Sequence, residues 1–198
     1  MLVFPGPIFT PPSAGGGSPP SFPASGVVVS DTDGSGWNVD NSSITTGITD
    51  PLAGTTAGRM TNGGISSQAA YVRKSATYSN ATQYTFSCYM KADGADYGWM
   101  NFYDGTTEFG VMFNLSTGAV VGNRTGGGTI SSSGVTSYGS GWYRCWFTFT
   151  TTNNNSNTYN AQVGVSSNGD LGFLVNSSSS TVKILVWRMQ VAAGALDT

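Results

Sequence analysis

The sequence contains no histidine, and only 9% of its 198 residues are charged. The missing histidine excludes nucleophiles activated by a histidine base, and it removes the usual zinc ligand sets. Eight Lys and Arg residues are scattered along a chain of formal net charge −2. Neither nucleic acid nor an acidic membrane surface is therefore expected as a partner. No apolar run approaches the ~20 residues that a membrane span requires.

Acidic residues provide one weak candidate for a catalytic pair. Glu108 is the only glutamate, and Asp104 lies shortly before it. Both flank an Asp-Gly turn, where an acid is expected for conformational reasons, whereas glycoside hydrolysis needs a defined carboxylate separation inside a cleft. The run Gly126–Gly128 lacks the Lys and Ser or Thr of a phosphate-binding loop. We therefore predict no catalytic residue, no cofactor and no enzyme activity.

The two cysteines, Cys88 and Cys145, lie in the middle of expected strands and on their inward faces. Two inward cysteines on neighbouring strands can form a disulfide, but buried cysteines in a chain without a secretory signal are more often free thiols. The N-terminal sequence has no positive segment, and Pro5 and Pro7 interrupt its apolar stretch. Free thiols and the absence of an export signal are the favoured interpretation.

Residues 1–30 contain no charged residue and hold seven of the eight prolines. This composition predicts an extended, polyproline-like arm in front of a single domain that covers residues 31–198. A floppy tail is the alternative. Several large apolar side chains, which are costly to leave in water, favour an arm that binds a partner. These side chains are Leu2, Val3, Phe4, Ile8, Phe9 and Phe22.

The 28 glycines and the lack of a helical apolar period predict many short strands joined by turns. Trp142–Thr150 alternates most strongly and is expected to be the central strand, with Gln83–Lys91 next in quality. Val182–Val191 is apolar on both faces and is expected inside a sheet. About nine or ten strands at this spacing predict an all-β, antiparallel two-sheet sandwich, with a jelly roll preferred.

The loop that contains Asp31, Asp33, Gly34 and Gly36 has the spacing found at the start of a calcium loop. No acid follows at the position that an EF-hand needs. A plain turn is favoured, and a calcium site built partly from backbone carbonyls stays open as the alternative.

Aromatic residues recur at positions opposite the deduced core, where rings can stack on pyranose sugars. The alternative is that a loop, the arm or a neighbouring subunit covers these rings. The candidate glycan-binding residues are Tyr89, Tyr97, Trp99, Tyr103, Arg144 and Trp146. Trp142 shares the same face, Lys91 is a further possible donor, and Asn123 and Arg124 in a nearby loop can add polar contacts.

Three stretches together resemble a known family. They are YTFSCYMKADG (84–94), FNLSTGAV (113–120) leading to GSGWYRCWFTFT (139–150), and VWRMQVAAGALDT (186–198). In order and spacing they are similar to the carbohydrate-binding-module-like jelly-roll domain of tailed-bacteriophage virion proteins. The resemblance covers residues 37–198. It departs from the family pattern at Val191, which stands where a glutamate usually follows the glutamine.

This resemblance implies a virion structural protein whose fold often binds glycans. The expected role is a capsid decoration or cement protein, assembled in the host cytoplasm, displayed on the virion surface and attached by its arm to the major capsid protein or a tail protein. A homotrimer is favoured by the same resemblance. The alternative role is a tail fibre or appendage adhesin that binds cell-surface glycans.

Overall fold

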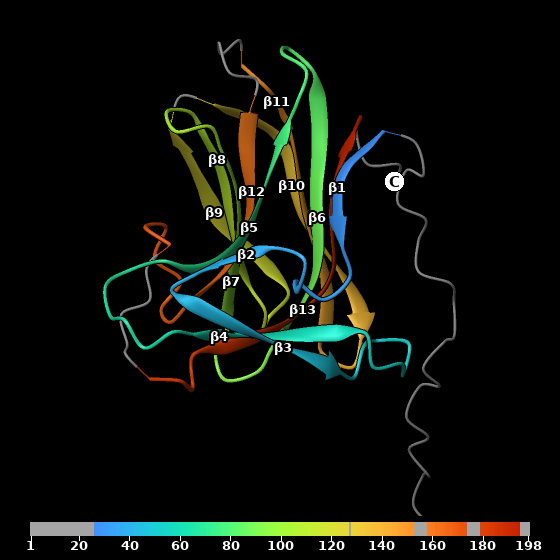
Figure 1. Ribbon diagram of the computed structural model, residues 1–198, viewed down its shortest axis with the longest axis vertical. Helices are drawn as coiled ribbons and strands as arrows, with labels where there is room; N and C mark the ends of the chain where they lie inside the picture. Colours follow the sequence, from blue (N-terminus) through green and yellow to red (C-terminus); the bar gives the residue numbers. More distant parts are fainter. Residues whose placement is uncertain (1–25, 127, 153–157, 174–178, 195–198) are drawn as a thin grey trace, which may run out of the picture.

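The computed structural model describes residues 26–126, 128–152, 158–173 and 179–194. Every regular element in these ranges is a β-strand, and all strand pairs are antiparallel. Two sheets pack face to face as a jelly-roll sandwich (Figure 1). The expected fold class is confirmed. The arm side chains from Leu2 to Phe22 lie outside the described residues.

One layer, which we call sheet A, has seven strands in the order β10, β11, β6, β13, β4 and β3, with β1 also paired to β13. Its strands are β1 (Val27–Asp31), β3 (Ser42–Ile48), β4 (Ala57–Asn62), β6 (Gln83–Ala92), β10 (Thr129–Gly139), β11 (Trp142–Thr150) and β13 (Lys183–Ala193). β1 and β4 follow one another along the same side of β13, because β6 occupies its other side.

The second layer, sheet B, has six strands in the order β2, β5, β12, β7, β8 and β9. Its strands are β2 (Asn38–Asp40), β5 (Ala70–Thr77), β7 (Tyr97–Tyr103), β8 (Glu108–Asn114), β9 (Ala119–Gly126) and β12 (Thr158–Ser166). No helix within the described ranges is long and apolar enough to cross a membrane.

The core between the sheets follows the period-two alternation of the strands. Phe86 and Cys88 of β6 and Phe149 of β11 point inward, as the sequence pattern predicted. Phe102 of sheet B meets Phe149 of sheet A with ring centroids 4.4 Å apart. Each such fully buried side chain stabilises the fold by roughly 1.5–3 kcal/mol. This aromatic layer joins the two sheets.

The Trp142–Thr150 strand has the expected bounds but not the expected place. It is β11, and only β10 separates it from the edge of sheet A, so the prediction of a central strand is wrong. The centre of the sheet is formed by β6 and β13. The physical reason is β10, a long and mostly polar strand that pairs along all of β11 and shields it from solvent.

The last strand, β13, is internal as expected, but its alternation is interrupted. Met189 lies in the core together with Ile184 and Val186, whereas uninterrupted alternation would put it on the opposite face with Trp187. The pairing of β13 with β6 shifts register between Trp187 and Gln190. This bulge adds one residue, so the inward and outward positions exchange after it.

The sandwich begins before residue 31, the predicted domain boundary. Val27–Asp31 forms β1 and pairs with β13, and the Gly26 carbonyl accepts a hydrogen bond from the Ala193 N–H at 2.9 Å. Residues 27–30 therefore belong to sheet A and not to the arm.

The loop after β1 is an Asx-type turn, as the sequence favoured. The Asp31 carboxylate accepts hydrogen bonds from the N–H groups of Asp33, Gly34 and Gly36. Both carboxylate oxygens therefore accept hydrogen bonds that stabilise the loop.

The two cysteines face one another across β6 and β11, and both are buried free thiols. Burial raises the pKa of the Cys88 thiol and that of the Cys145 thiol. Both groups are consequently protonated at neutral pH and act as small apolar side chains. The interpretation as free thiols agrees with the structure.

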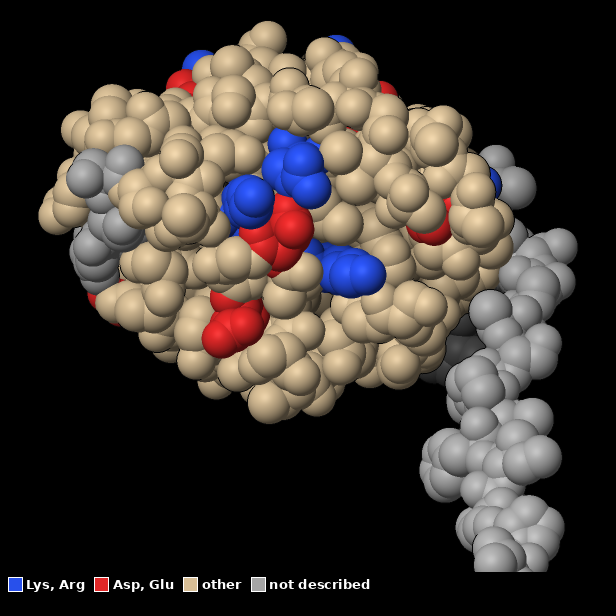
Figure 2. Space-filling view, turned by 90° about the horizontal axis from the view of Figure 1, so that it is seen from below, with Lys and Arg blue, Asp and Glu red and all other residues tan. Residues whose placement is uncertain are grey.

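Charged side chains are sparse on the surface. Figure 2 shows a face that is mostly uncharged, with a central group of acidic and basic side chains and a few further charged side chains near the rim. Arg59 and Asp93 form one of the surface ion pairs, and Lys183 lies 4.0 Å from the same carboxylate.

A buried carboxylate organises the loop between β3 and β4. Asp50 accepts hydrogen bonds from the N–H groups of Leu52, Gly54 and Thr56 and from the Thr56 hydroxyl, which lies 2.7 Å away. The Thr56 hydroxyl oxygen in turn accepts the Trp187 indole N–H at 2.9 Å. Burial raises the pKa of Asp50, but the hydrogen bonds from Thr56, Leu52 and Gly54 outweigh burial, so the pKa is lowered from its ordinary value.

We expect Asp50→Asn to lower the free energy of unfolding by about 1–3 kcal/mol at pH 7, because charge-assisted hydrogen bonds to a buried group are lost. The folded-state pKa is depressed, so this carboxylate stabilises the fold above its unfolded value of 3.8 and the contribution disappears as the pH falls through the folded value. Urea unfolding from pH 7 to pH 2 should show the wild-type advantage shrinking below pH 3.8. The exposed Asp96→Asn is the control, and an advantage that persists undiminished in acid contradicts the assignment.

Candidate functional site

The aromatic residues predicted to form one glycan-binding face lie on opposite sides of the sandwich. Tyr89 and Trp146 occupy the outer face of sheet A, which is the face directed away from sheet B. Tyr97, Trp99 and Tyr103 occupy the outer face of sheet B. Alternation had correctly identified outward positions, but it cannot say to which sheet a strand belongs. These rings therefore do not share a single face of the protein.

On sheet A most of the predicted residues are covered. Tyr89 is fully buried between Trp187 and Tyr138, with ring centroids 5.1 and 5.2 Å away. Arg144 is 5% exposed, and burial lowers the pKa of its guanidinium. Trp146 is half-buried, and its ring lies over Gly134, where a Cβ atom would come within 2.6 Å of the ring. Trp146 is thus the predicted residue on this face that solvent reaches.

On sheet B the indole of Trp99 is sandwiched and only 1% exposed. One side of the ring lies against the backbone of Gly164, and the other stacks on Phe173 at 4.7 Å and an interplanar angle of 6°. The indole N–H donates to the Val165 carbonyl at 3.2 Å. Trp99 is therefore not exposed for stacking on a sugar. The alternative expectation, that a loop covers the ring, applies to this residue.

A pocket of about 270 Å³ lies beside this stack on the outer face of sheet B. Its lining combines aromatic rings with amide, carboxylate and guanidinium groups. The lining residues are Ala69, Tyr71, Trp99, Asn101, Tyr103, Glu108, Arg124, Gln162, Gly172 and Phe173. It contains Trp99 and Tyr103 of the candidate residues, whereas Tyr97 lies outside it. Arg124, which was expected in a loop, also lines the pocket, but it lies on β9.

Two buried amides form the polar floor of the pocket. The Asn101 amide nitrogen donates to Gln162 Oε1 at 3.0 Å and to Glu108 Oε1 at 2.9 Å. Asn101 is 3% exposed and Gln162 8%. They are direct neighbours because β7 and β12 pair Asn101 with Gln162. The amide orientations are therefore set by the sheet before any ligand arrives.

An ion pair closes one side of the pocket. Arg124 Nε lies 2.9 Å from Glu108 Oε2, and another guanidinium nitrogen donates to the Gly172 carbonyl at 2.9 Å. The guanidinium carbon also lies 5.2 Å from the centre of the Phe173 ring. Because Arg124 is balanced by Glu108, this pocket is close to electrically neutral.

A backbone hydrogen bond and the space left by Gly110 hold Phe173 in place. Phe173 has a left-handed φ of 58°, and its N–H donates to the Asp170 carbonyl at 2.9 Å. A Cβ atom at Gly110 would come within 2.5 Å of the Phe173 ring. Glycine at this position of β8 therefore leaves the space that the phenyl ring fills.

The carboxylates Glu108 and Asp104, weighed above as a catalytic pair, do not line this pocket together. Among the described residues that line the pocket, Glu108 is the single acid. The Asp104 carboxylate instead accepts hydrogen bonds from the N–H groups of Thr106 and Thr107 and so holds the turn. Within the described ranges, no group of three or more Cys, Asp and Glu residues stands together to hold a metal ion.

Sequence reasoning missed Tyr71, Asn101, Gln162 and Phe173. A signal did exist for the two amides, because each is a polar residue at an outward position of a strand with apolar neighbours. Phe173 gives no such signal, because it lies in a loop and is brought to Trp99 only by the folded chain.

No protein-family model matches the sequence, and the search of curated proteins finds no match. Solved structures to which this chain is similar include a CBM4 structure, with 12% identity and a TM-score of 0.45 over 80% of this chain and 79% of that chain. A second is the CBM22-1-GH10 modules of Clostridium thermocellum endo-1,4-beta-D-xylanase 10B in complex with xylohexaose, with 13% identity and a TM-score of 0.46 over 87% of this chain and 29% of that chain.

A third is the enzymatically active domain of bacteriophage CBA120 tailspike protein 4, with 9% identity and a TM-score of 0.43 over 82% of this chain and 20% of that chain. At these identities and TM-scores the likeness carries no information on a ligand of this chain.

Gly164→Ala should disrupt the stack beside the pocket, because the new Cβ would lie 2.1 Å from the Trp99 ring. We expect a loss of about 1–3 kcal/mol in the free energy of unfolding from overpacking, measured by guanidinium denaturation. Gly122→Ala is the matched control on the same sheet, since its Cβ would meet only the tip of Leu171 at 3.2 Å. Equal stability of the two variants would show that Trp99 is not held against Gly164.

Proposed function

We propose that this protein is a non-catalytic carbohydrate-binding module that takes a neutral saccharide in the pocket on the outer face of sheet B. The observation that carries the proposal is the hydrogen-bonded floor of Asn101, Gln162 and Glu108 between the rings of Tyr71 and Tyr103. Sugars present apolar C–H faces and hydroxyl edges, and such a site offers a partner for each.

The rings that flank the floor are fixed and partly exposed. The Tyr103 hydroxyl donates to the Gly105 carbonyl at 2.8 Å, and the Tyr71 ring packs at 5.6 Å against Trp99. Their positions on paired strands mean that little side-chain freedom remains to be lost when a sugar binds.

The Asn101 carbonyl oxygen supports the same proposal. It is buried and has no hydrogen-bond donor among the residues that the structure describes. A buried acceptor without a donor is costly, and a ligand hydroxyl entering the pocket can satisfy it. The balanced Glu108 and Arg124 pair favours a saccharide without net charge.

We expect Tyr71→Ala combined with Tyr103→Ala to weaken saccharide binding about tenfold or more, because two stacking surfaces are removed. The measurement is isothermal titration calorimetry with neutral oligosaccharides of glucose, xylose and mannose, after thermal unfolding has shown that the variant is folded. Tyr138→Ala, which removes a half-buried tyrosine from sheet A, is the matched control and should bind as the wild type does. Unchanged affinity in the double variant, or no binding of any sugar by the wild type, would refute the proposal.

A more specific role is that of a virion structural protein. We propose a capsid decoration or cement protein, displayed on the virion surface and attached to the major capsid protein or a tail protein by the segment that precedes β1, residues 1–25, with a tail-appendage adhesin as the alternative. The supporting observation is the uncharged, proline-rich N-terminal sequence with its large apolar residues. Such a segment gains most by covering apolar surface on a partner. Homotrimer formation belongs to this proposal.

Deletion of residues 1–25 should leave a folded domain, since β1 and its pairing with β13 remain intact. We expect thermal unfolding close to that of the full chain, together with loss of incorporation into particles. Light scattering on both chains then separates two mechanisms: a trimer that dissociates means that the arm joins its own oligomer, and an unchanged mass means that the arm is available for another protein. Normal incorporation of the truncated chain would rule out attachment by the arm.

A further inference from the structure

The outer face of sheet A differs in charge from the rest of the protein. The adjacent strands β10, β11, β6 and β13 contain no acidic residue, although the whole chain has ten. They hold half of the eight basic residues, namely Lys91, Arg144, Lys183 and Arg188. These four strands therefore carry a net positive charge, although Lys183 lies 4.0 Å from the Asp93 carboxylate and Arg144 is buried.

Arg188 forms the bulge of β13 and has an unusual backbone. Its φ is 49°, in the left-handed region, and its N–H donates to the Thr32 carbonyl at 2.8 Å. Because the strand gains one residue here, Trp187 and Arg188 both turn to the outer face, and the guanidinium lies 4.4 Å above the indole of Trp187. A non-glycine residue persists in this conformation only where its surroundings hold it, and such residues cluster at functional sites.

The Arg188 guanidinium is also available for an anion. It makes no ion pair with any residue that the structure describes, whereas the arginines 59, 73 and 124 each contact a carboxylate. Its aromatic support is rigid, because the Trp187 indole is anchored on Thr56 and through it on Asp50. An arginine that is stacked on an indole keeps its nitrogen fork free for bidentate contacts.

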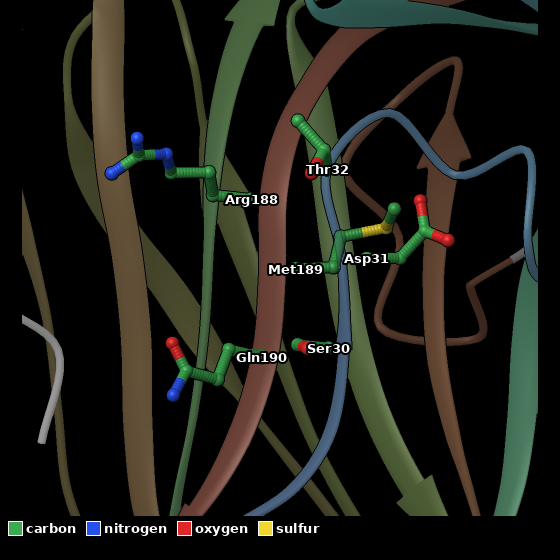
Figure 3. Close-up of a pocket in the computed structure, with 6 residues that line it drawn as sticks. All are labelled: Ser30, Asp31, Thr32, Arg188, Met189 and Gln190. Carbon is green, nitrogen blue, oxygen red and sulfur yellow. The ribbon is translucent and has the colours of Figure 1, made fainter. Parts of the chain in front are cut away.

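A pocket of about 410 Å³ opens at this bulge, within the size range of small-ligand sites. It is lined by Ser30, Asp31, Thr32, Arg188, Met189 and Gln190. Figure 3 shows Arg188 and Gln190 pointing to one side of β13, while Asp31 and Met189 point to the other. The Asp31 carboxylate is moreover occupied by three backbone N–H groups. A ligand on the Arg188 side therefore meets a cation and an amide.

We propose that this pocket binds an acidic saccharide, with the carboxylate of a sugar acid on Arg188 and its hydroxyls on Gln190 and Ser30. The planar guanidinium matches a carboxylate in a two-point contact. This site is independent of the neutral-sugar pocket on sheet B, because it lies on the opposite face of the sandwich and uses none of the same residues.

Trp146 gives the site an extension. Strand pairing aligns Gln190 with Ser87 and Ser87 with Trp146, so Trp146 lies two strands away, roughly 10 Å at about 4.8 Å per strand. Its half-exposed ring over Gly134 can stack on a further sugar unit of the same chain. A nucleic acid is disfavoured, since phosphate binding needs several exposed cations and Arg144 is buried.

The test is calorimetry on the full chain with trigalacturonate and with a neutral galactose trisaccharide of the same length. We expect the acid to bind and Arg188→Gln to weaken it tenfold or more, while binding of neutral sugars is unchanged. Lys74→Gln makes the same change in net charge at an exposed lysine of β5 that does not line the pocket, and this variant should bind the acid as the wild type does. Raising the salt concentration should weaken binding of the acid.

Arg188→Asn provides a second variant, because asparagine tolerates the left-handed backbone if the glutamine variant does not fold. The proposal is overturned if trigalacturonate does not bind the wild type, or if both Arg188 variants bind it with wild-type affinity. It is also overturned if triglutamate or a DNA oligonucleotide of equal charge binds as tightly as trigalacturonate. A further contradicting result is loss of trigalacturonate binding in the Tyr71→Ala, Tyr103→Ala variant but not in the Arg188 variants. Loss of neutral-sugar binding in that tyrosine variant alone would concern only the sheet B site.

Discussion

The aromatic layer between the two sheets is the contact on which both candidate sites depend. Phe102 of β7 and Phe149 of β11 meet in this layer, 4.4 Å between ring centroids, and the strands that carry them also carry outward residues of the two faces. Close packing of the core fixes the backbones of these strands, and the outward side chains on the same strands are therefore held in fixed positions. Asn101 and Trp146 are each held next to an inward core residue in this way.

The two outer faces also differ in charge. On sheet B, Glu108 lies against Arg124, so the polar groups around Asn101 remain neutral overall. On sheet A, four neighbouring strands lack acidic residues, and Arg188 stands on Trp187 with no carboxylate paired to it in the described part of the chain. One sandwich can therefore present a neutral and a cationic surface on opposite faces, with the core between them.

Local irregularities add side chains to both candidate sites. The bulge at Arg188 turns two consecutive side chains outward, and the left-handed Phe173 directs a phenyl ring onto Trp99. Glycines at 110 and 164 make room for these rings because a Cβ atom at either position would collide with them. Regular alternation forms the sandwich, and departures from it place Arg188 and Phe173 beside the two pockets.

Alternation along the chain was enough to predict the all-β sandwich, the inward faces of β6 and β11 and the buried cysteines, because those features depend on neighbours two residues apart. Which sheet each strand joins was decided only by the tertiary structure, and so Tyr89 and Trp99 separated onto opposite faces. The same is true of Phe173 over Trp99 and of Arg188 beside Gln190 across the bulge. Such contacts depend on pairing and loop closure between distant segments, and the period of a single strand carries no information about them.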